Sequence, residues 1–242
     1  MDAKKLVIIV GAGPGLGAAL AHRFGRASMN VVMACRQPSR LEALAAEYSG
    51  LGHGVLVRRC DATDESSVQA LFEWAEGEFG CPDVVIYNAG AFVQRPLLDT
   101  PLEEFERCWR TSCLGGFLVG REAARSLRQR LEAGGLGGTI LFTGATASLR
   151  GSAGFHNLAV GKFGLRALAQ SMARELGPQG IHVAHVVIDG RIRRPEVVEH
   201  AGDADGRYLD PDAVAEAYFA LAAQPPSAWT QELDLRPSVE RF

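Results

Sequence analysis

The sequence lacks any long hydrophobic run. The apolar stretch nearest its start, residues 6–10 in "KKLVIIVGAG", is five residues long and ends at a glycine. A secretory signal needs a longer apolar core, and a membrane helix needs about 20 apolar residues. We therefore expect no membrane association, a buried strand at 5–10 and a cytoplasmic protein.

Cysteine is scarce and shows no ligand spacing. The five cysteines include no CxxC pair, and their odd number does not suit a disulfide framework. These absences argue against a zinc site and a disulfide-stapled secreted fold, so we expect no metal and reduced thiols. The cysteines are Cys35, Cys60, Cys81, Cys108 and Cys113.

The chain also lacks an excess of charge of one sign. It holds 25 Lys and Arg against 28 Asp and Glu, which gives a formal net charge of −3 and a pI near 6.1. Nucleic acids and anionic membranes attract basic surfaces, so neither is an expected partner. Internal repeats and low-complexity segments are absent too, so one domain of 242 residues is expected.

Short apolar runs alternate with longer helical patterns along the chain. Runs rich in Val and Ile, bounded by Gly, Asn or Asp, indicate strands buried on both faces. Strict alternation with helices predicts an α/β fold: a single-domain, Rossmann-like, doubly wound parallel sheet of about seven strands with helices on both faces. The predicted strands are 5–10, 30–34, 54–59, 83–87, 138–143, 181–188 and 232–235; the predicted helices are 15–27, 39–48, 64–79, 102–132, 158–176 and 211–223.

The glycine-rich turn after the first strand predicts a phosphate site. In "VIIVGAGPGLGAALAHRF", Gly11, Gly15 and Gly17 form the pattern GxxxGxG between a strand and a helix. Glycine allows a tight turn and close approach to a pyrophosphate, and the following helix offers free N–H groups. A purely structural glycine turn is the alternative, but its position after the first strand favours dinucleotide binding.

The end of the second strand favours NADP over NAD. NAD-binding proteins place an acidic residue here to hold the ribose hydroxyls, whereas this chain has Cys35 followed by Arg36, in "VVMACRQPSR". A guanidinium can pair with a 2′-phosphate. The alternative interpretation is a solvated surface arginine.

With these motifs in order, the chain resembles the short-chain dehydrogenase/reductase family over almost its whole length. The similar segments are "GAGPGLG" (11–17), "CDATDESSV" (60–68), "YNAG" (87–90), "WRTSCLGGFLVGREA" (109–123) and "VGKFGLRALAQSMARELGPQGIHVAHVVIDG" (160–190). The resemblance implies an NADP(H)-dependent oxidoreductase that acts on a small-molecule substrate. It also implies a homodimer or homotetramer, assembled through the helices at 102–132 and 158–176.

The resemblance also assigns cofactor-binding residues. The glycine turn with Leu16 would hold the pyrophosphate, Asp61 and Ala62 would border the adenine, and Asn88, Ala89 and Gly90 would lie along the ribose. Gly190 and Ile192 would border the nicotinamide, although the family's usual Pro-Gly is Asp189-Gly190 here. Lys162 would bind the nicotinamide ribose.

The family's proton-donating residues are missing. In the family a tyrosine four residues before the lysine protonates the carbonyl oxygen, and a serine thirteen residues earlier holds that oxygen. Here these positions are Leu158 and Ala145, and Ser112 takes the place of the usual asparagine. Enoyl reductases place the tyrosine seven residues before the lysine, where this chain has Phe155.

Other side chains could replace the missing groups. His156 lies in the turn entering the predicted helix, and an imidazole group is suited to proton transfer near neutral pH. Asn157 could cap the helix or bind a substrate. Thr143, Thr146 and Ser148 lie near the serine position, although loop hydroxyls and turn histidines often have no chemical role. We predict Lys162, His156 and Ser112 as the catalytic set.

The retained cofactor motifs and the missing tyrosine and serine leave two functions open. The first is an NADP(H)-dependent reductase with non-standard proton delivery, acting on a C=O, C=N or activated C=C bond. The second is a catalytically impaired protein that binds NADP(H) or supports an oligomer; a lyase or isomerase ranks last. Residues 91–99 and 189–210 should shape the substrate pocket. Arg95, Arg191, Arg193 and Arg194 could bind an acidic group there or form a solvated rim.

Overall fold

A seven-stranded parallel sheet forms the centre of the molecule. The computed structural model describes residues 4–193 and 206–240, and the strand order is β3-β2-β1-β4-β5-β6-β9. Every neighbouring pair in this sheet is parallel. The strands are β1 (Leu6–Val10), β2 (Asn30–Cys35), β3 (Gly54–Arg59), β4 (Val84–Tyr87), β5 (Thr139–Thr143), β6 (His182–Ile188) and β9 (Glu232–Leu235). The predicted fold class and the short last strand are confirmed.

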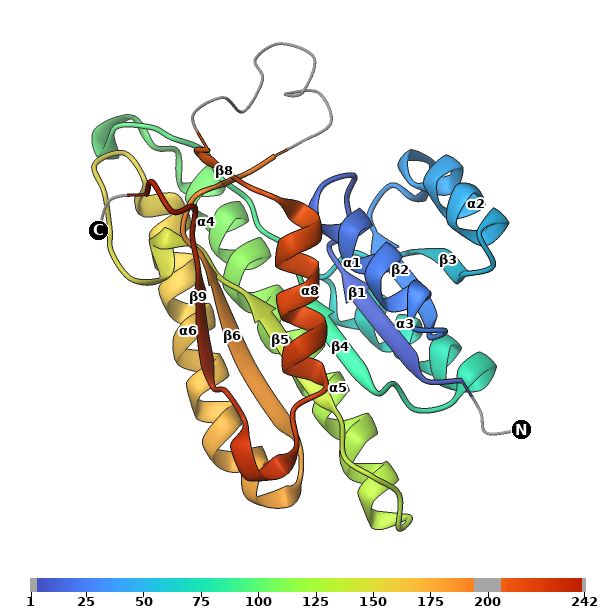
Figure 1. Cartoon of the computed structure of the whole chain (residues 1–242). Helices are drawn as coiled ribbons and strands as arrows, with labels where there is room; N and C mark the ends of the chain where they lie inside the picture. The colour runs from blue at the N-terminus through green and yellow to red at the C-terminus, as the bar shows by residue number, and fades with distance from the viewer. Residues whose placement is uncertain (1–3, 194–205, 241–242) are drawn as a thin grey trace.

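Helices cover both faces of this sheet (Figure 1). One core joins the sheet to α1, α2 and α8, and the other joins it to α3, α5 and α6. Their bounds are α1 (Leu16–Arg26), α2 (Glu42–Gly50), α3 (Glu65–Phe79), α4 (Leu102–Trp109), α5 (Gly115–Glu132), α6 (His156–Leu176) and α8 (Pro211–Ala222). A separate pair of two-residue strands, β7 (Arg191–Ile192) and β8 (Tyr208–Leu209), flanks the undescribed part of the predicted substrate loop.

Apolar strands and capped helices explain this layout. All residues of β1, β4, β5 and β6 are buried, because parallel strands are covered on both faces. Asp64 caps α3 by accepting hydrogen bonds from the backbone N–H groups of Ser66 and Ser67. Pro211 opens α8 at a position that needs no N–H donor, and Asp210 caps it.

Two predicted helices differ from the structure in ways that matter for the site. The helix expected at 102–132 is α4 and α5 joined by one π-helical turn, Arg110–Leu114. The helix expected at 158–176 begins at His156, so this histidine occupies its first turn. A π turn inserts one extra residue, and side-chain periodicity alone does not reveal it.

Within the described ranges, no helix is long and apolar enough to cross a membrane, and no cluster of three or more His, Cys, Asp or Glu side chains could hold a metal. All five cysteines are free thiols. The strand order reverses between β1 and β4, and such a switch point opens a crevice at the carboxyl ends of the strands.

Candidate active site

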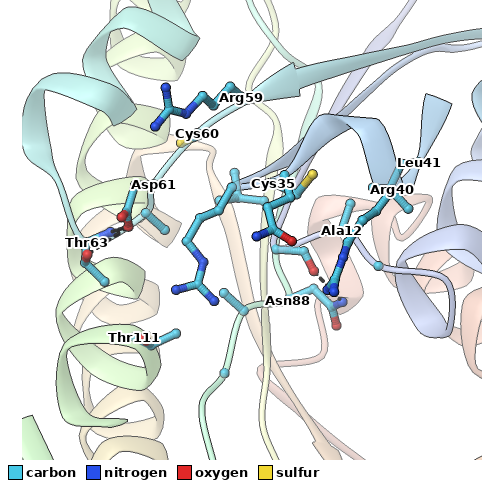
Figure 2. A pocket seen from close by; sticks show the side chains of 18 of the residues that line it. Ala12, Cys35, Arg40, Leu41, Arg59, Cys60, Asp61, Thr63, Asn88 and Thr111 are labelled. Carbon is cyan, nitrogen blue, oxygen red and sulfur yellow. Dashed lines mark hydrogen bonds between the residues drawn. The ribbon is translucent and has the colours of Figure 1, made fainter. Parts of the chain in front are cut away.

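A cavity of about 660 Å³ lies at this switch point. Its walls come from the loops that follow β1, β2, β3 and β4, together with Thr111 of the π turn. Figure 2 shows Arg59, Asp61 and Thr63 on one side, Arg40 and Leu41 on the other, and Cys35 between them. Of the predicted cofactor residues, those lining the cavity are Gly11, Arg36, Asp61, Ala62, Asn88, Ala89 and Gly90.

Gly11 brings the β1 and β4 loops into contact. Its φ of 84° lies in the region that favours glycine, and a Cβ atom on it would lie 2.4 Å from the backbone nitrogen of Ala89. The Asn88 Nδ2 group donates to the Gly11 carbonyl oxygen at 3.2 Å, and the Asn88 N–H donates to Val10. These contacts fix the loops after β1 and β4 relative to each other where Gly11 and Asn88 line the cavity.

The amino end of α1 is suited to a pyrophosphate. Gly15 precedes Leu16 and Gly17 at the start of α1, whose first turn holds no acidic residue. A Cβ atom on Gly15 would meet no atom within 4 Å, whereas one on Gly17 would lie 2.9 Å from Ala12. Gly17 thus packs the helix against the turn and Gly15 leaves open space. The first N–H groups of a helix and its dipole attract anions.

Three arginines line the cavity beside the carboxyl ends of β2 and β3. Arg36 follows β2, Arg40 ends a short 3-10 turn (Pro38–Arg40), and Arg59 ends β3, and all three line the cavity with Cys35. The sequence pointed to Arg36, in a segment that also contains Arg40, and gave no signal for Arg59. Arg59 reaches the cavity because it pairs with Cys35 across the parallel strands, and the sequence alone does not reveal that register.

Asp61 lies on the opposite wall from Arg40. Its Oδ1 atom accepts hydrogen bonds from the backbone N–H and the hydroxyl of Thr63, at 2.9 and 2.8 Å, as Figure 2 shows. Its backbone N–H donates to the Ser67 hydroxyl at 3.0 Å. These hydrogen bonds fix the loop and involve only one of the two carboxylate oxygens of Asp61, next to Ala62.

Lys162 connects this cavity to the carboxyl ends of β4 and β5. Its Nζ atom donates to the carbonyl oxygen of Thr143 at 2.7 Å and to that of Ala89 at 3.4 Å. A Cβ atom on Gly90 would lie 3.5 Å from the same Nζ. Lys162 does not line the cavity itself, but it contacts Ala89 and lies close to Gly90, which do.

Burial sets the protonation of Lys162. The residue is 5% exposed, and desolvation lowers the pKa of its ammonium group to about 8. His185 of β6 lies in the same region, and burial lowers its pKa to about 4, so it is neutral at pH 7. The Nδ1 atom of His185 lies 3.1 Å from the Glu232 carboxylate. Glu232 also forms a bidentate ion pair with Arg166, with N–O distances of 2.6 and 2.7 Å.

Ser112 contacts the loop that follows β4. It is fully buried in the π turn, and its Oγ accepts a hydrogen bond from the Ala91 N–H at 3.4 Å. A Cβ atom on Gly161 would lie 2.6 Å from the Cβ of Ser112, so glycine allows α6 to touch the π turn beside Lys162. The predicted catalytic serine is thus next to Lys162 in the fold while its hydroxyl is directed at the backbone.

Leu158 and Ala145 stand at the two positions where the family resemblance expects hydroxyl groups, and neither lines the described cavity. Leu158 precedes Lys162 by one helical turn, so both lie on one face of α6. Both Leu158 and Ala145 are partly exposed. Both positions that lack the family's hydroxyl groups are therefore partly open to solvent.

The three loop hydroxyls near Ala145 have other partners. Thr143 Oγ1 contacts the Tyr218 hydroxyl at 2.8 Å, and both residues are buried. Ser148 is fully buried, and its Oγ accepts from the Ala145 N–H at 3.1 Å. Thr146 donates to Asp189.

His156 and Asn157 point to other neighbours than Lys162. The His156 Nε2 atom lies 2.9 Å from the Thr100 hydroxyl. Six residues along a helix correspond to a rotation of about 240°, so His156 and Lys162 lie on different faces of α6. Asn157 is fully buried and donates weakly to Val93 and Glu104, at 3.4 and 3.5 Å.

Replacement of His156 by alanine tests its predicted part in catalysis. An essential acid would lose at least tenfold in turnover with NADPH. Because its ring nitrogen is bonded to Thr100 and its helical face differs from that of Lys162, we expect a change below twofold. Thr100→Val is the matched control, since it removes the same hydrogen bond and keeps the imidazole. A tenfold loss in His156→Ala alone would return the histidine to the mechanism.

The β6 end of the site is only partly described. Gly190 follows Asp189 with a φ of 152°, and Ile192 lies in β7; neither lines the described cavity. Arg95 forms a bidentate ion pair with Glu104. The Arg193 guanidinium forms an ion pair with Asp210 at an N–O distance of 2.6 Å. Arg191 is exposed, and Arg194 lies outside the described residues, as does the predicted substrate loop from 194 to 205.

Comparisons with known proteins agree with this geometry. Residues 5–193 match the family described as short chain dehydrogenase. A solved short-chain dehydrogenase from Rhodopseudomonas palustris is 41% identical, with a TM-score of 0.83 over 96% of this chain and 98% of that one. The (21S)-21-acetoxyl-apo-melianone synthase SDR of Melia azedarach is 31% identical over 90% of this chain and 82% of its own.

A further structure is described with a nicotinamide cofactor derivative. It is an alcohol dehydrogenase from the archaeon Thermococcus sibiricus complexed with 5-hydroxy-NADP, 25% identical, with a TM-score of 0.86 over 99% of both chains. Fold, site geometry and family match agree over nearly the whole chain. The chain belongs to the short-chain dehydrogenase/reductase family of oxidoreductases.

Proposed function

We propose that this protein is an NADP(H)-dependent oxidoreductase that transfers hydride to a small organic substrate without the family's tyrosine. One observation carries the proposal: a built cofactor cavity leads to a buried lysine whose neighbours at the reaction end, Leu158 and Ala145, are apolar. Bound NADPH supplies the hydride. The substrate bond is C=O, C=N or activated C=C.

The residues present fit that cofactor. The open space at Gly15 and the amino end of α1 would take the pyrophosphate, and Arg36, Arg40 and Arg59 would take a 2′-phosphate. Lys162 would hold the nicotinamide ribose from the other end. Leu158 and Ala145 would exclude water there, which strengthens the remaining electrostatic interactions.

Turnover and binding together test the proposal. NADPH oxidation is followed against ketones, aldehydes, imines and enones, and NADPH binding is measured separately by fluorescence. Consumption of NADPH with at least one class is the expected result. Tight NADPH binding with no turnover of any class would instead favour the catalytically impaired protein.

Arg36→Asp should reverse the cofactor preference. We expect the wild type to bind NADPH at least tenfold more tightly than NADH, because a guanidinium pairs with the 2′-phosphate. The aspartate repels that phosphate and can accept hydrogen bonds from ribose hydroxyls, so the variant should favour NADH. The measurement is fluorescence titration with both cofactors.

Arg26→Asp is the matched control for that reversal. It makes the same charge change at the end of α1, away from the residues that line the cavity. Equal dissociation constants for the two cofactors in the wild type, or an unchanged preference in Arg36→Asp, would contradict the assignment.

The outer surface of α4, α5 and α6 supports assembly into a homodimer or homotetramer. Large apolar side chains are exposed there: Trp109, Phe117, Val160 and Phe163. These helices lie side by side behind the sheet in Figure 1. Contiguous exposed apolar surface marks an interaction site. We infer that a second copy of the chain covers it.

Phe163→Glu should therefore dissociate the oligomer. Phe163 is 42% exposed in the single chain, and a buried carboxylate would oppose association. Light scattering should show the mass falling to that of one chain, 25.9 kDa. Leu136→Glu, at an exposed site beyond α5, is the control and should keep the wild-type mass. A monomeric wild type would contradict the proposal directly.

A further inference from the structure

Three guanidinium groups line the cavity, and none of them is paired with a carboxylate. In the part of the chain that the structure describes, no ion pair joins Arg36, Arg40 or Arg59 to an acidic side chain. Asp61 is the one carboxylate among the residues that line the cavity, and its Oδ1 atom accepts both hydrogen bonds from Thr63. Unpaired cations gathered around one cavity favour an anionic ligand there.

The register of the sheet places Arg59 beside Cys35. The two residues are partners across the parallel pair of β2 and β3, and residues in register on neighbouring strands point to the same face of a sheet. Side chains alternate along β3. Val57 packs into the core with α1 and α2, whereas Arg58 lies on the other face, with its guanidinium 4.2 Å from the ring centre of Trp74 on α3. Arg59 therefore shares with Cys35 the side of the sheet that α1 and α2 cover.

The turn that leads into α2 brings Arg40 to the same place. This turn, Pro38–Arg40, follows Cys35 and Arg36 in the chain and contacts β3. In Figure 2, Arg59 lies on one side of Cys35 and Arg40 on the other, and all three line the cavity. An anion bound beside Cys35 would therefore meet guanidinium groups from the ends of two strands and from this turn.

Cys35 occupies a position where a carboxylate would cancel part of this charge. NAD-binding proteins place an acidic residue at the end of the second strand. Because neighbouring strands lie about 4.8 Å apart, an aspartate at position 35 would be within reach of an ion pair with Arg59. The thiol is neutral at pH 7, since burial raises the pKa of Cys35, and it leaves the Arg59 guanidinium without an anionic neighbour.

We propose, on the basis of the proposed function, that Arg59 is a second residue that selects NADP(H), and that Cys35 permits this selection by leaving its charge unpaired. Arg36 follows the position that distinguishes the two cofactors directly in the sequence, whereas Arg59 reaches it from the neighbouring strand. Its guanidinium pairs with the 2′-phosphate, the one group by which NADPH differs from NADH. Discrimination between the cofactors is therefore shared by β2 and β3.

The binding of four nucleotides tests the role of Arg59. NADPH and NADH differ by the 2′-phosphate, and so do adenosine 2′,5′-bisphosphate and adenosine 5′-monophosphate, which lack the nicotinamide end. Arg59→Gln should weaken binding of the two 2′-phosphorylated nucleotides about tenfold and leave the other two within twofold of the wild type. Arg58→Gln is the matched control, because it removes the adjacent guanidinium on the opposite face of β3, and it should change none of the four. Calorimetric titration gives the dissociation constants, and thermal melting checks folding.

A double-mutant cycle tests the role of Cys35. Cys35→Asp should lower the preference for NADPH over NADH, because its carboxylate pairs with Arg59 and repels the phosphate. Arg59→Gln should then reduce that preference less than threefold in the Cys35→Asp background, against about tenfold in the wild type. Cys35→Asn has the shape of the aspartate without its charge, so in that background Arg59→Gln should keep the tenfold effect.

Each outcome separates the inference from the proposed function. Tight NADPH binding that Arg59→Gln does not weaken, or an equal loss for all four nucleotides, would overturn the role of Arg59 while the cofactor assignment stands. Equal effects of Arg59→Gln in the wild type and in Cys35→Asp would overturn the role of Cys35. Equal affinities of the wild type for NADPH and NADH would overturn the inference together with the NADP(H) preference. A tenfold loss specific to the 2′-phosphate would support the inference even if no substrate turned over, a result that would contradict only the oxidoreductase activity.

Discussion

Placing a tyrosine at position 158 and a serine at position 145 should raise kcat/KM for ketone reduction by about 10²–10⁴-fold, the usual contribution of general acid catalysis. Leu158 lies one helical turn before Lys162 and is partly exposed, so a phenol there would lie on the same face of α6 as the ammonium group. The positive charge lowers the pKa of such a phenol. A hydroxyl at the partly exposed position 145 would hold the substrate oxygen.

The matched control for this gain is Leu158→Phe/Ala145→Ser. It adds the same ring and the same serine, and it lacks only the phenolic oxygen. NADPH oxidation with the ketone α-tetralone should distinguish the two variants by at least 100-fold. If the tyrosine and phenylalanine variants reduce the ketone within threefold of each other, the missing tyrosine is not what limits this site.

The sequence predicts the fold because the signals that determine it are local. The strand β1 is a five-residue apolar run that ends at Gly11, and all five residues are buried. Near-continuous apolar strands alternating with helices permit few arrangements other than a covered parallel sheet. The placement of Gly11, Asn88 and Gly90 in one cavity follows from the same topology, since carboxyl ends of adjacent parallel strands share one edge.

The features that the sequence could not predict depend on contacts between distant segments. Arg59 lines the cavity through its register with Cys35 across two strands. The bond from Thr146 to Asp189 joins residues 43 positions apart. The π turn at Arg110–Leu114 lies against Gly161 of α6, and no periodicity in 102–132 reveals it. Motif reasoning finds the residues that hold a cofactor, whereas hydrogen-bond directions, which decide the chemistry, appear only in three dimensions.

Lys162→Met should weaken NADPH binding at least tenfold and reduce turnover further, because this side chain alone carries a positive charge from α6 to the carboxyl ends of β4 and β5. Methionine keeps the length and the apolar stem, so it tests the charge rather than the volume. Titration fluorescence measures binding, and thermal melting checks folding. Wild-type affinity for NADPH should also fall as the pH rises through about 8, where Lys162 loses its proton, and the variant should lack this step.

The same substitution should change how stability depends on pH in the cofactor-free protein. The pKa of Lys162 is about 8 in the folded state against 10.5 for an ordinary lysine. Below pH 8 both states hold the proton, and the folded state carries the full cost of burying a charge. Between pH 8 and 10.5 only the unfolded state stays protonated, so raising the pH favours folding.

That cost follows from the size of the pKa shift. A difference of 2.5 pKa units, 10.5 minus 8, corresponds to about 3 kcal/mol at 1.36 kcal/mol per unit. In urea unfolding, the free energy of unfolding of the wild type should therefore rise relative to that of Lys162→Met by up to about 3 kcal/mol between pH 8 and 10.5. A constant difference between the two proteins from pH 7 to 10 would mean that Lys162 is hydrated.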